Sequence, residues 1–146
     1  MRSLNEDWVA TMSRERTVWI VEDEAASATL AADLCEANGV AASLFRLPLP
    51  FLTALRTTSP PTLVILDWRL EHDLTAGLFL ATRHRYPRLP VIYWTGSTVS
   101  ALPSMISDDG WTVIVEKASG TTSFEEALAW ALVVPVSEEP EGVAVS

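Results

Sequence analysis

Short apolar runs alternate with segments of helical periodicity along most of this chain. Each run contains four to six residues, which is the length expected of a strand. An alternation of strands with helices is typical of an α/β domain built around a parallel sheet. The runs predicted to be strands are residues 17–21, 40–45, 63–66, 91–94 and 111–115.

Three of the predicted strands consist almost entirely of β-branched, aromatic and other large apolar residues: TVWIV at 17–21, LVIL at 63–66 and VIYW at 91–94. In a parallel sheet such runs belong to strands that helices cover on both faces. We therefore expect these three strands to lie at the centre of the sheet, with helices on each side of it.

The segment between the first two predicted strands has the clearest helical pattern. Ala26 and Leu30 are followed at helical spacing by Leu34 and Ala37, which predicts the apolar face of a helix. Gly39 comes next, where helices commonly end on a residue in the left-handed conformation. The pattern therefore predicts a helix that ends just before Gly39.

Three further helices are predicted after the second, third and fourth strands. Residues 50–56 begin with a proline, which the first turn of a helix tolerates. Residues 75–85 place Leu78 on an apolar face opposite basic residues, and they end shortly before another proline. Residues 99–107 contain a proline and few strong helix formers, so this helix is expected to be short, bent or frayed.

The last helix is predicted from a capping box. In the sequence SFEE, which starts at Ser123, a hydroxyl residue is followed three positions later by a glutamate, and this pair satisfies free N–H groups at a helix start. We expect a helix from Ser123 to about Val133. Its predicted buried residues are Leu128, Ala131 and Leu132.

The composition fits a single domain with one sizeable core. The chain has 146 residues, of which 49% are apolar and 20% are charged. All the predicted elements fall within residues 16–134, which are expected to form the domain. Residues 1–15 are then an N-terminal extension, and residues 135–146 are an acidic C-terminal tail too short to fold alone.

The charge and the cysteine content argue against several classes of protein. Ten Lys and Arg residues against nineteen Asp and Glu give a net charge of −9, which repels a nucleic-acid backbone. The single cysteine, Cys35, cannot form a disulfide framework and is expected to be a small buried residue. The longest apolar stretch, residues 127–136, is much shorter than the roughly 20 residues of a membrane helix. Residues 1–16 contain no apolar segment of the kind found in a secretory signal, so we do not expect export. We therefore expect a cytoplasmic protein that binds neither nucleic acid nor membranes.

Polar residues follow the apolar runs at the point where ligands collect in an open parallel sheet. Glu22 and Asp23 follow the first run, Asp67 the third, Thr95 the fourth and Lys117 comes shortly after the fifth. Three converging carboxylates would repel one another unless a hard cation joined them, and oxygen ligands suit Mg²⁺. Lys117 adds a positive charge and Thr95 a hydroxyl donor. Together these residues predict a site for phosphoryl transfer to a carboxylate.

These residues resemble the motif of response regulator receiver domains of two-component signalling, in the same order and at similar spacing over residues 16–134. The resemblance implies that Asp67 is the phosphoryl acceptor and that Mg²⁺ is its cofactor. Asp23 would bind the ion directly, Glu22 mainly through water, and Arg69 through its backbone carbonyl. The protein would be no conventional enzyme, but would catalyse its own phosphorylation and dephosphorylation.

The resemblance also implies a fold and a set of partners. The fold would be a flavodoxin-like three-layer sandwich with a five-stranded parallel sheet of order 2-1-3-4-5. Phosphate would come from a histidine kinase or a phosphotransfer protein, and Thr95 would move toward it while Lys117 neutralises its charge. The output would pass to a downstream protein target through the surface of helices 99–107 and 123–133 and the strand between them. That face is also the expected surface of a homodimer.

Several positions depart from the family pattern. Ile114 stands where the family often has a tyrosine or phenylalanine that rotates with the switch hydroxyl, so that rotation is not expected here. Ala118 replaces a proline in a cis bond, and we predict a trans bond because a cis bond without proline costs about 3 kcal/mol. Glu71 adds an acid after the acceptor, while Arg69 and Ser97 occupy positions that tune phosphate loss. We hypothesise that Arg69 contacts the phosphoryl group or a pocket carboxylate.

Six tryptophans are unusual for this length, and most are expected in the core. Trp68 follows the acceptor in a predicted loop. Trp111 and Trp130 belong to the predicted signalling face. Exposed aromatic residues often anchor interfaces, so these two are candidates for a dimer or partner patch.

Two alternatives remain open from the sequence. The chain could be a pseudo-receiver, a phosphorylation-independent interaction module, as Ile114 and Ala118 would allow. It could also be an aspartate-nucleophile phosphohydrolase of the haloacid dehalogenase type, although Arg69 stands where that class needs an acid.

Overall fold

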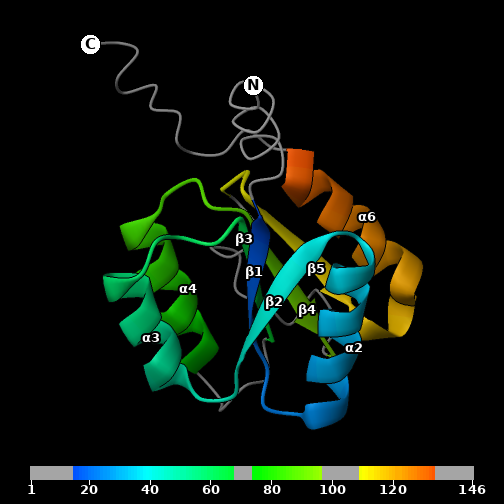
Figure 1. The fold of residues 1–146 in the computed structure, drawn as a ribbon, viewed down its shortest axis with the longest axis horizontal. Helices are drawn as coiled ribbons and strands as arrows, with labels where there is room; N and C mark the ends of the chain where they lie inside the picture. The colour runs from blue at the N-terminus through cyan, green and yellow to red at the C-terminus, as the bar shows by residue number, and fades with distance from the viewer. Residues whose placement is uncertain (1–14, 68–73, 97–108, 134–146) are drawn as a thin grey trace, which may run out of the picture.

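The computed structural model describes residues 15–67, 74–96 and 109–133. Within them the chain forms a five-stranded parallel sheet with the order β2-β1-β3-β4-β5 (Figure 1). The order of strands predicted from the sequence is therefore confirmed. The strands are β1 (Arg16–Val21), β2 (Val40–Phe45), β3 (Leu63–Leu66), β4 (Val91–Thr95) and β5 (Thr112–Glu116).

Helices cover both faces of the sheet, as expected for a three-layer sandwich. Figure 1 shows α2 (Ala25–Ala37) and α6 (Thr121–Val133) on one face, and α3 (Pro48–Thr57) and α4 (Leu74–Arg85) on the other. A short 3-10 turn, η2 (Lys117–Ser119), connects β5 to α6. The helix predicted over residues 99–107 lies outside the described residues.

Alternate side chains of the central strands belong to two separate apolar clusters, one on each face of the sheet. Val18 and Ile20 of β1 point to the α2 and α6 face, where they pack in one cluster with Phe124. Trp19 and Val21 point to the other face and join a cluster that contains Phe51 of α3 and residues of α4. Every residue of β3 and β4 is buried, so the prediction of central strands is confirmed.

The buried face of α2 differs from the predicted one. The helix exists and ends before Gly39, whose φ of +82° is the left-handed conformation expected there. However, its buried residues are Ala28, Ala31 and Cys35, whereas Leu30 is 41% exposed. The buried side chains of α2 are thus small ones that pack in the core cluster, and the larger leucine lies on the exposed part of the helix.

Burial raises the pKa of the Cys35 thiol to about 12, so the thiol stays protonated near neutral pH. The prediction of a small buried residue is therefore confirmed.

The start of the last helix was predicted incorrectly. Helix α6 begins at Thr121, so Ser123 lies inside the first turns and does not cap the helix. Gly120, with a φ of +93°, ends the 3-10 turn, and the chain enters the helix directly after it. The buried residues Leu128 and Ala131 agree with the prediction, while Leu132 is only partly buried.

The entry into β5 is held by a charged network at the end of the sheet away from the predicted site. Arg83 of α4 donates hydrogen bonds to the carbonyl oxygens of Leu89 (2.6 Å) and Trp111 (2.8 Å) and forms an ion pair with Asp109. Asp109 in turn accepts hydrogen bonds from the Trp111 N–H (2.8 Å) and the Thr112 hydroxyl (2.9 Å). These contacts join α4 to the start of the edge strand.

Two of the tryptophans are core residues as expected: Trp19 is 6% exposed and Trp94 is 5% exposed. Trp111 and Trp130 are partly buried, so neither ring is enclosed in the core. Trp68 lies outside the described residues. None of the helices in the described part of the chain has both the length and the apolar character needed to span a bilayer.

Candidate functional site

The carboxyl ends of four strands bring the predicted site residues to one edge of the sheet. Glu22 comes directly after β1, Asp67 after β3 and Lys117 after β5, while Thr95 is the last residue of β4. The strand register pairs Val21 with Leu66, and Thr95 with Glu116. Because these pairs are the last residues of their strands, the polar residues that follow meet at the same level.

Backbone hydrogen bonds fix the first two carboxylates in place. The Glu22 N–H donates to the Phe45 carbonyl oxygen (3.1 Å), and the Asp67 N–H donates to the Val21 carbonyl oxygen (3.2 Å). The buried hydroxyl of Thr75, at the start of α4, donates to the Asp67 carbonyl oxygen at 2.8 Å. Both carboxylates are thus attached to the rigid end of the sheet.

Three carboxylates gather at this edge. One oxygen from each of Glu22, Asp23 and Asp67 lies within 4.8 Å of the others. Glu22 is 3% exposed and Asp67 is 6% exposed, whereas Asp23 faces solvent. The predicted acidic cluster is therefore present, with two buried carboxylates and one at the surface.

The surroundings of Glu22 oppose its ionisation. Burial, followed by the neighbouring charge of Asp67, raises the pKa of Glu22 to about 7, although Lys117 acts in the opposite direction. One lysine thus only partly compensates the negative charge of the cluster. A further cation at this position would lower the electrostatic free energy of the site.

The ammonium group of Lys117 lies between the two buried carboxylates. Its Nζ is 3.0 Å from Oε1 of Glu22 and 3.9 Å from Oδ1 of Asp67. The first distance is a hydrogen-bonded ion pair, and the second is an electrostatic contact beyond hydrogen-bonding range. The ammonium group therefore lies beside both buried carboxylates, at the edge of the sheet where the sequence places Lys117.

Two further side chains contact the lysine, and the sequence analysis missed both. Lys117 Nζ donates to the Ser27 hydroxyl oxygen at 3.2 Å, and that hydroxyl donates to Oε1 of Glu24 at 2.6 Å. The ammonium group also lies 5.1 Å from the centre of the Trp94 ring. Trp94 directly precedes Thr95, but its apolar strand context gave no signal of a role at the site.

The donor set fits a magnesium ion. At metal–oxygen distances near 2.1 Å, an octahedral ion holds ligand oxygens about 3 to 4.2 Å apart, so small side-chain movements would bring the cluster around it. The oxygens of Glu22 already bind Lys117 and the Glu24 N–H (3.1 Å), which favours contact through water for this residue. The other two members of the cluster, Asp23 at the surface and Asp67 at the strand end, suit direct ligation.

Some of the other predicted site residues lie within the described part of the chain. Thr95 is fully buried at the end of β4. Ile114 is partly buried in β5, and the bond between Lys117 and Ala118 is trans, as predicted. Arg69, with its expected carbonyl ligand and phosphoryl contact, lies outside the described residues, as do Glu71 and Ser97.

Several solved structures with the same fold are response regulator receiver domains. A CheY-like receiver domain protein from Methanospirillum hungatei is 16% identical over 81% of this chain and 94% of that chain, with a TM-score of 0.71. The non-phosphorylated HemR receiver domain from Leptospira biflexa is 16% identical over 84% and 98%, with a TM-score of 0.70. A receiver protein from Burkholderia phymatum is 20% identical over 84% and 99%, with a TM-score of 0.67.

No protein-family model and no curated protein matches the sequence. The structural likeness nevertheless extends over almost the whole length of these three receivers. The chain has the flavodoxin-like fold of response regulator receiver domains, which the sequence resemblance predicted.

Proposed function

We propose that this protein is a receiver that accepts a phosphoryl group on Asp67. The observation that carries the proposal is the arrangement around this carboxylate. Asp67 is buried at a strand end, shares an acidic cluster with Glu22 and Asp23, and has the Lys117 ammonium group 3.9 Å away. A carboxylate that belongs to an acidic cluster suited to a cation, and that lies close to a positive charge, is suited to phosphoryl transfer.

In the proposed step, an Asp67 carboxylate oxygen attacks the phosphorus of a phosphohistidine on a histidine kinase or phosphotransfer protein. A P–O bond forms, the P–N bond breaks, and the leaving imidazole keeps the electron pair and takes up a proton. Lys117 neutralises part of the charge on the transferred group. Water later attacks the aspartyl phosphate, which releases inorganic phosphate and restores Asp67.

Asp23, Asp67 and, through water, Glu22 would hold Mg²⁺, with the Arg69 carbonyl as the further expected ligand. When bound, the ion supplies charge neutralisation for the phosphoryl oxygens. The chain's own contribution is to hold the acceptor rigidly. The Thr75 hydroxyl does so by binding the Asp67 carbonyl, and the sheet does so through the Asp67 N–H.

The proposed signal passes from Asp67 to the surface of β5 and α6. An added phosphoryl group carries a charge of about −1.5 to −2, which would draw the Thr95 hydroxyl toward it. Thr95 pairs with Glu116 in the register of β4 and β5, so a movement of Thr95 would shift residues of the edge strand β5. The output would then be a change in contacts with a downstream protein.

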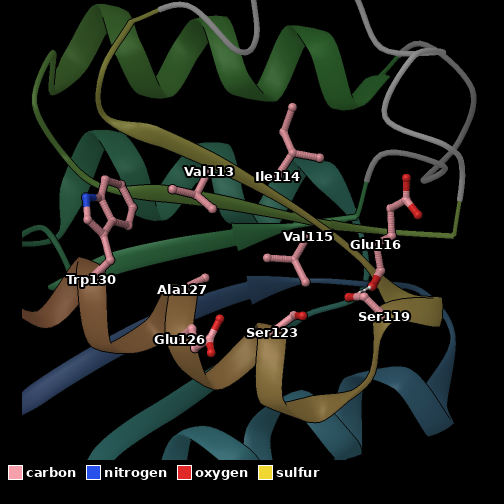
Figure 2. A pocket seen from close by; sticks show the side chains of 9 residues that line it. All are labelled: Val113, Ile114, Val115, Glu116, Ser119, Ser123, Glu126, Ala127 and Trp130. Atoms are coloured by element: carbon pink, nitrogen blue, oxygen red, sulfur yellow. Dashed lines mark hydrogen bonds between the residues drawn. The ribbon is translucent and has the colours of Figure 1, made fainter.

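A groove between β5 and α6 is suited to such a protein contact. It has a volume of about 440 Å³, and its apolar lining includes Val113 of β5 and Ala127 of α6. Figure 2 shows Trp130 at one end of the groove and Glu116 at the other, with Glu126 along the helix side. A partner segment with an apolar side chain and a basic side chain would complement this surface. A second copy of this chain, joined through the same face, is the homodimer expected from the sequence.

Incubation with acetyl phosphate and Mg²⁺, followed by intact mass measurement, tests the proposed acceptor. We expect a mass increase of one phosphoryl group that disappears in Asp67→Ala. The matched control is Asp33→Ala, which removes an exposed carboxylate from α2 and should leave phosphorylation unchanged. Chelation of Mg²⁺ should abolish the mass increase in the wild type.

A wild-type protein that gains no mass under these conditions, and gains none from a panel of phosphorylated kinases, would contradict the proposal. It would favour the pseudo-receiver alternative, in which the fold acts only through protein contacts. Release of phosphate from simple phosphate esters with repeated turnover would instead favour the phosphohydrolase alternative.

A further inference from the structure

Lys117 is the only lysine among the ten basic residues of the chain; the other nine are arginines. Its ammonium group is 3.0 Å from Glu22, 3.2 Å from Ser27 and 5.1 Å from the centre of the Trp94 ring. A cation within about 6 Å of a ring centre is attracted by the negative face of the ring. The indole of Trp94 therefore forms part of the lysine's immediate environment.

Trp94 is held in place by packing on its own side of the sheet. Its side chain belongs to the cluster under α2 and α6, where the ring meets Phe124 edge-to-face with 5.0 Å between the ring centres. The buried indole Nε1 has no hydrogen-bond partner among the described residues. A hydrogen bond therefore does not explain why a tryptophan stands here, whereas the contact of its ring with Lys117 gives it a role.

The ring contact differs from the other lysine contacts in one respect. An ammonium group has three N–H donors, and here Glu22 and Ser27 accept two hydrogen bonds from it. A ring face attracts the charge without needing a hydrogen bond from it. Asp67, at 3.9 Å, is also beyond hydrogen-bonding range of the ammonium group. Among the described residues, the third N–H of Lys117 thus has no hydrogen-bond acceptor. This N–H is available to a group attached to Asp67.

We propose that Trp94 is a positioning residue, whose ring face holds the Lys117 ammonium group between Glu22 and Asp67 with one N–H left for a phosphoryl oxygen. This role rests on the proposed function, since it assumes that Asp67 accepts the phosphoryl group. Without the ring, the attraction of Glu22 and Ser27 alone would hold the lysine, and both lie on the side of β1 and α2. An aliphatic side chain at position 94 would fill the space without this attraction.

The contact itself can be measured independently of phosphorylation. Selective ¹³C labelling of lysine gives one ε-methylene NMR signal, because the chain has one lysine. We expect this signal to be shifted upfield by the indole ring current. The shift should be lost in Trp94→Leu and partly kept in Trp94→Phe. Trp19→Leu, which removes an equally buried indole from the opposite face, is the control and should leave the signal in place.

The same variants then test the positioning role. With acetyl phosphate and Mg²⁺, we expect Trp94→Leu to be phosphorylated about three- to thirtyfold more slowly, as the loss of a partly desolvated cation–π contact implies. Trp94→Phe should retain much of the rate, because it keeps an aromatic face. Thermal unfolding of each variant identifies any that fails to fold, and Trp94→Phe remains the informative variant if Trp94→Leu does.

Two results would overturn the inference. One is an unshifted lysine signal in the wild type, or a shift that Trp94→Leu and Trp94→Phe both keep. The other is a phosphorylation rate that falls no further in the Trp94 variants than in Trp19→Leu. If the lysine signal responds as expected but the wild type takes up no phosphoryl group, the proposed function fails and the positioning role fails with it. The lysine signal could respond to the Trp94 variants while the wild type and these variants are phosphorylated at the same rate. That result would refute the positioning role alone.

Discussion

The Lys117 ammonium group forms its hydrogen-bonded ion pair with Glu22 at 3.0 Å, and it stays 3.9 Å from Asp67, the proposed acceptor. In this arrangement the ammonium group is beyond hydrogen-bonding distance of the proposed acceptor. The lysine therefore has only a short distance to move before it would contact a phosphoryl group on Asp67. Through its ion pair with Glu22, Lys117 is also expected to contribute to the stability of the fold.

Replacement of Lys117 should reveal that contribution to stability. Lys117→Met leaves the buried Glu22 carboxylate without its charged partner, so we expect the free energy of unfolding to fall by about 1–3 kcal/mol at neutral pH. Urea unfolding measures the change. The double variant with Glu22→Gln should recover part of the loss, since the two residues are directly coupled. Strictly additive losses would show that the ion pair has no energetic coupling.

Magnesium should stabilise the folded protein through the acidic cluster. Ligand linkage gives a gain of about 2.7 kcal/mol at a concentration of one hundred times Kd. We expect the melting temperature to rise with Mg²⁺ and to fall back after chelation with EDTA. Asp23→Asn should remove most of this dependence, because Asp23 belongs to the cluster. Asp33→Asn serves as the control, and an equal loss in that variant would indicate general charge screening.

The hydroxyl of Thr75 should matter for both folding and the site. Thr75→Val removes the donor to the Asp67 carbonyl while it keeps the shape of the side chain, so the loss should be about 1–3 kcal/mol. Thr75→Ser keeps the hydroxyl and should retain the hydrogen bond. Urea unfolding measures the stability, and the acetyl phosphate assay measures the effect on Asp67. Equal stability and equal phosphorylation of Thr75→Val and Thr75→Ser would show that the hydrogen bond contributes to neither.

The Arg83–Asp109 network predicts a specific dependence of stability on pH. Burial acts to raise the pKa of Asp109, but hydrogen bonds from Arg83, the Trp111 N–H and the Thr112 hydroxyl together hold it below its usual value of 3.8. A lowered pKa contributes stability that is present above the unfolded-state value and disappears as pH falls through the folded-state value. Asp109→Asn should therefore be less stable than the wild type at pH 7.

Urea unfolding across the acid range tests this dependence. The difference between wild type and Asp109→Asn should shrink as pH falls below 3.8, where the wild-type carboxyl becomes protonated. The exposed Asp33 provides the comparison, since Asp33→Asn should differ little from the wild type at any pH. A difference between wild type and Asp109→Asn that stays constant with pH would contradict the ionic role of Asp109.

Two glycines should respond in opposite ways to the same substitution. Gly39 has a φ of +82° after α2, so Gly39→Ala should destabilise the protein by about 1 kcal/mol. Gly77 lies inside α4, and a methyl group added to its Cα would meet no packed neighbour within 4 Å. Gly77→Ala should therefore stabilise the helix by up to about 1 kcal/mol. Thermal unfolding measures both, and the same sign for the two variants would contradict the assigned backbone conformations.

The sequence predicted the sheet well because its strands carry strong local signals. β2 and β3 have the predicted bounds, and the central strands are those with continuous apolar runs. The site residues followed from the sheet, since a parallel topology brings every strand end to one edge. Asp67 and Lys117 could therefore be placed together although 50 positions separate them.

What the sequence did not predict depends on contacts between distant segments. Packing against the strands decides which side chains α2 presents to the sheet, so Leu30 was wrongly predicted to be buried and Ala28 was not predicted to be. The contacts of Lys117 with Ser27 and Trp94 join residues 90 and 23 positions apart, and neither residue type is a recognised signal. The cap predicted at Ser123 matched a local motif, but the chain entered the helix earlier, after Gly120.

The position of the single lysine also has a practical consequence for anyone who handles this protein. Reagents that acylate primary amines can react only with Lys117 and the terminal amine of the chain, and the Lys117 side chain is 22% exposed. Coupling to a biosensor surface or labelling with an amine-reactive dye would then risk blocking the very group that faces the acceptor. Attachment through an affinity tag avoids this, whereas protection of Lys117 from such reagents by a bound anion would offer a simple footprint of site occupancy.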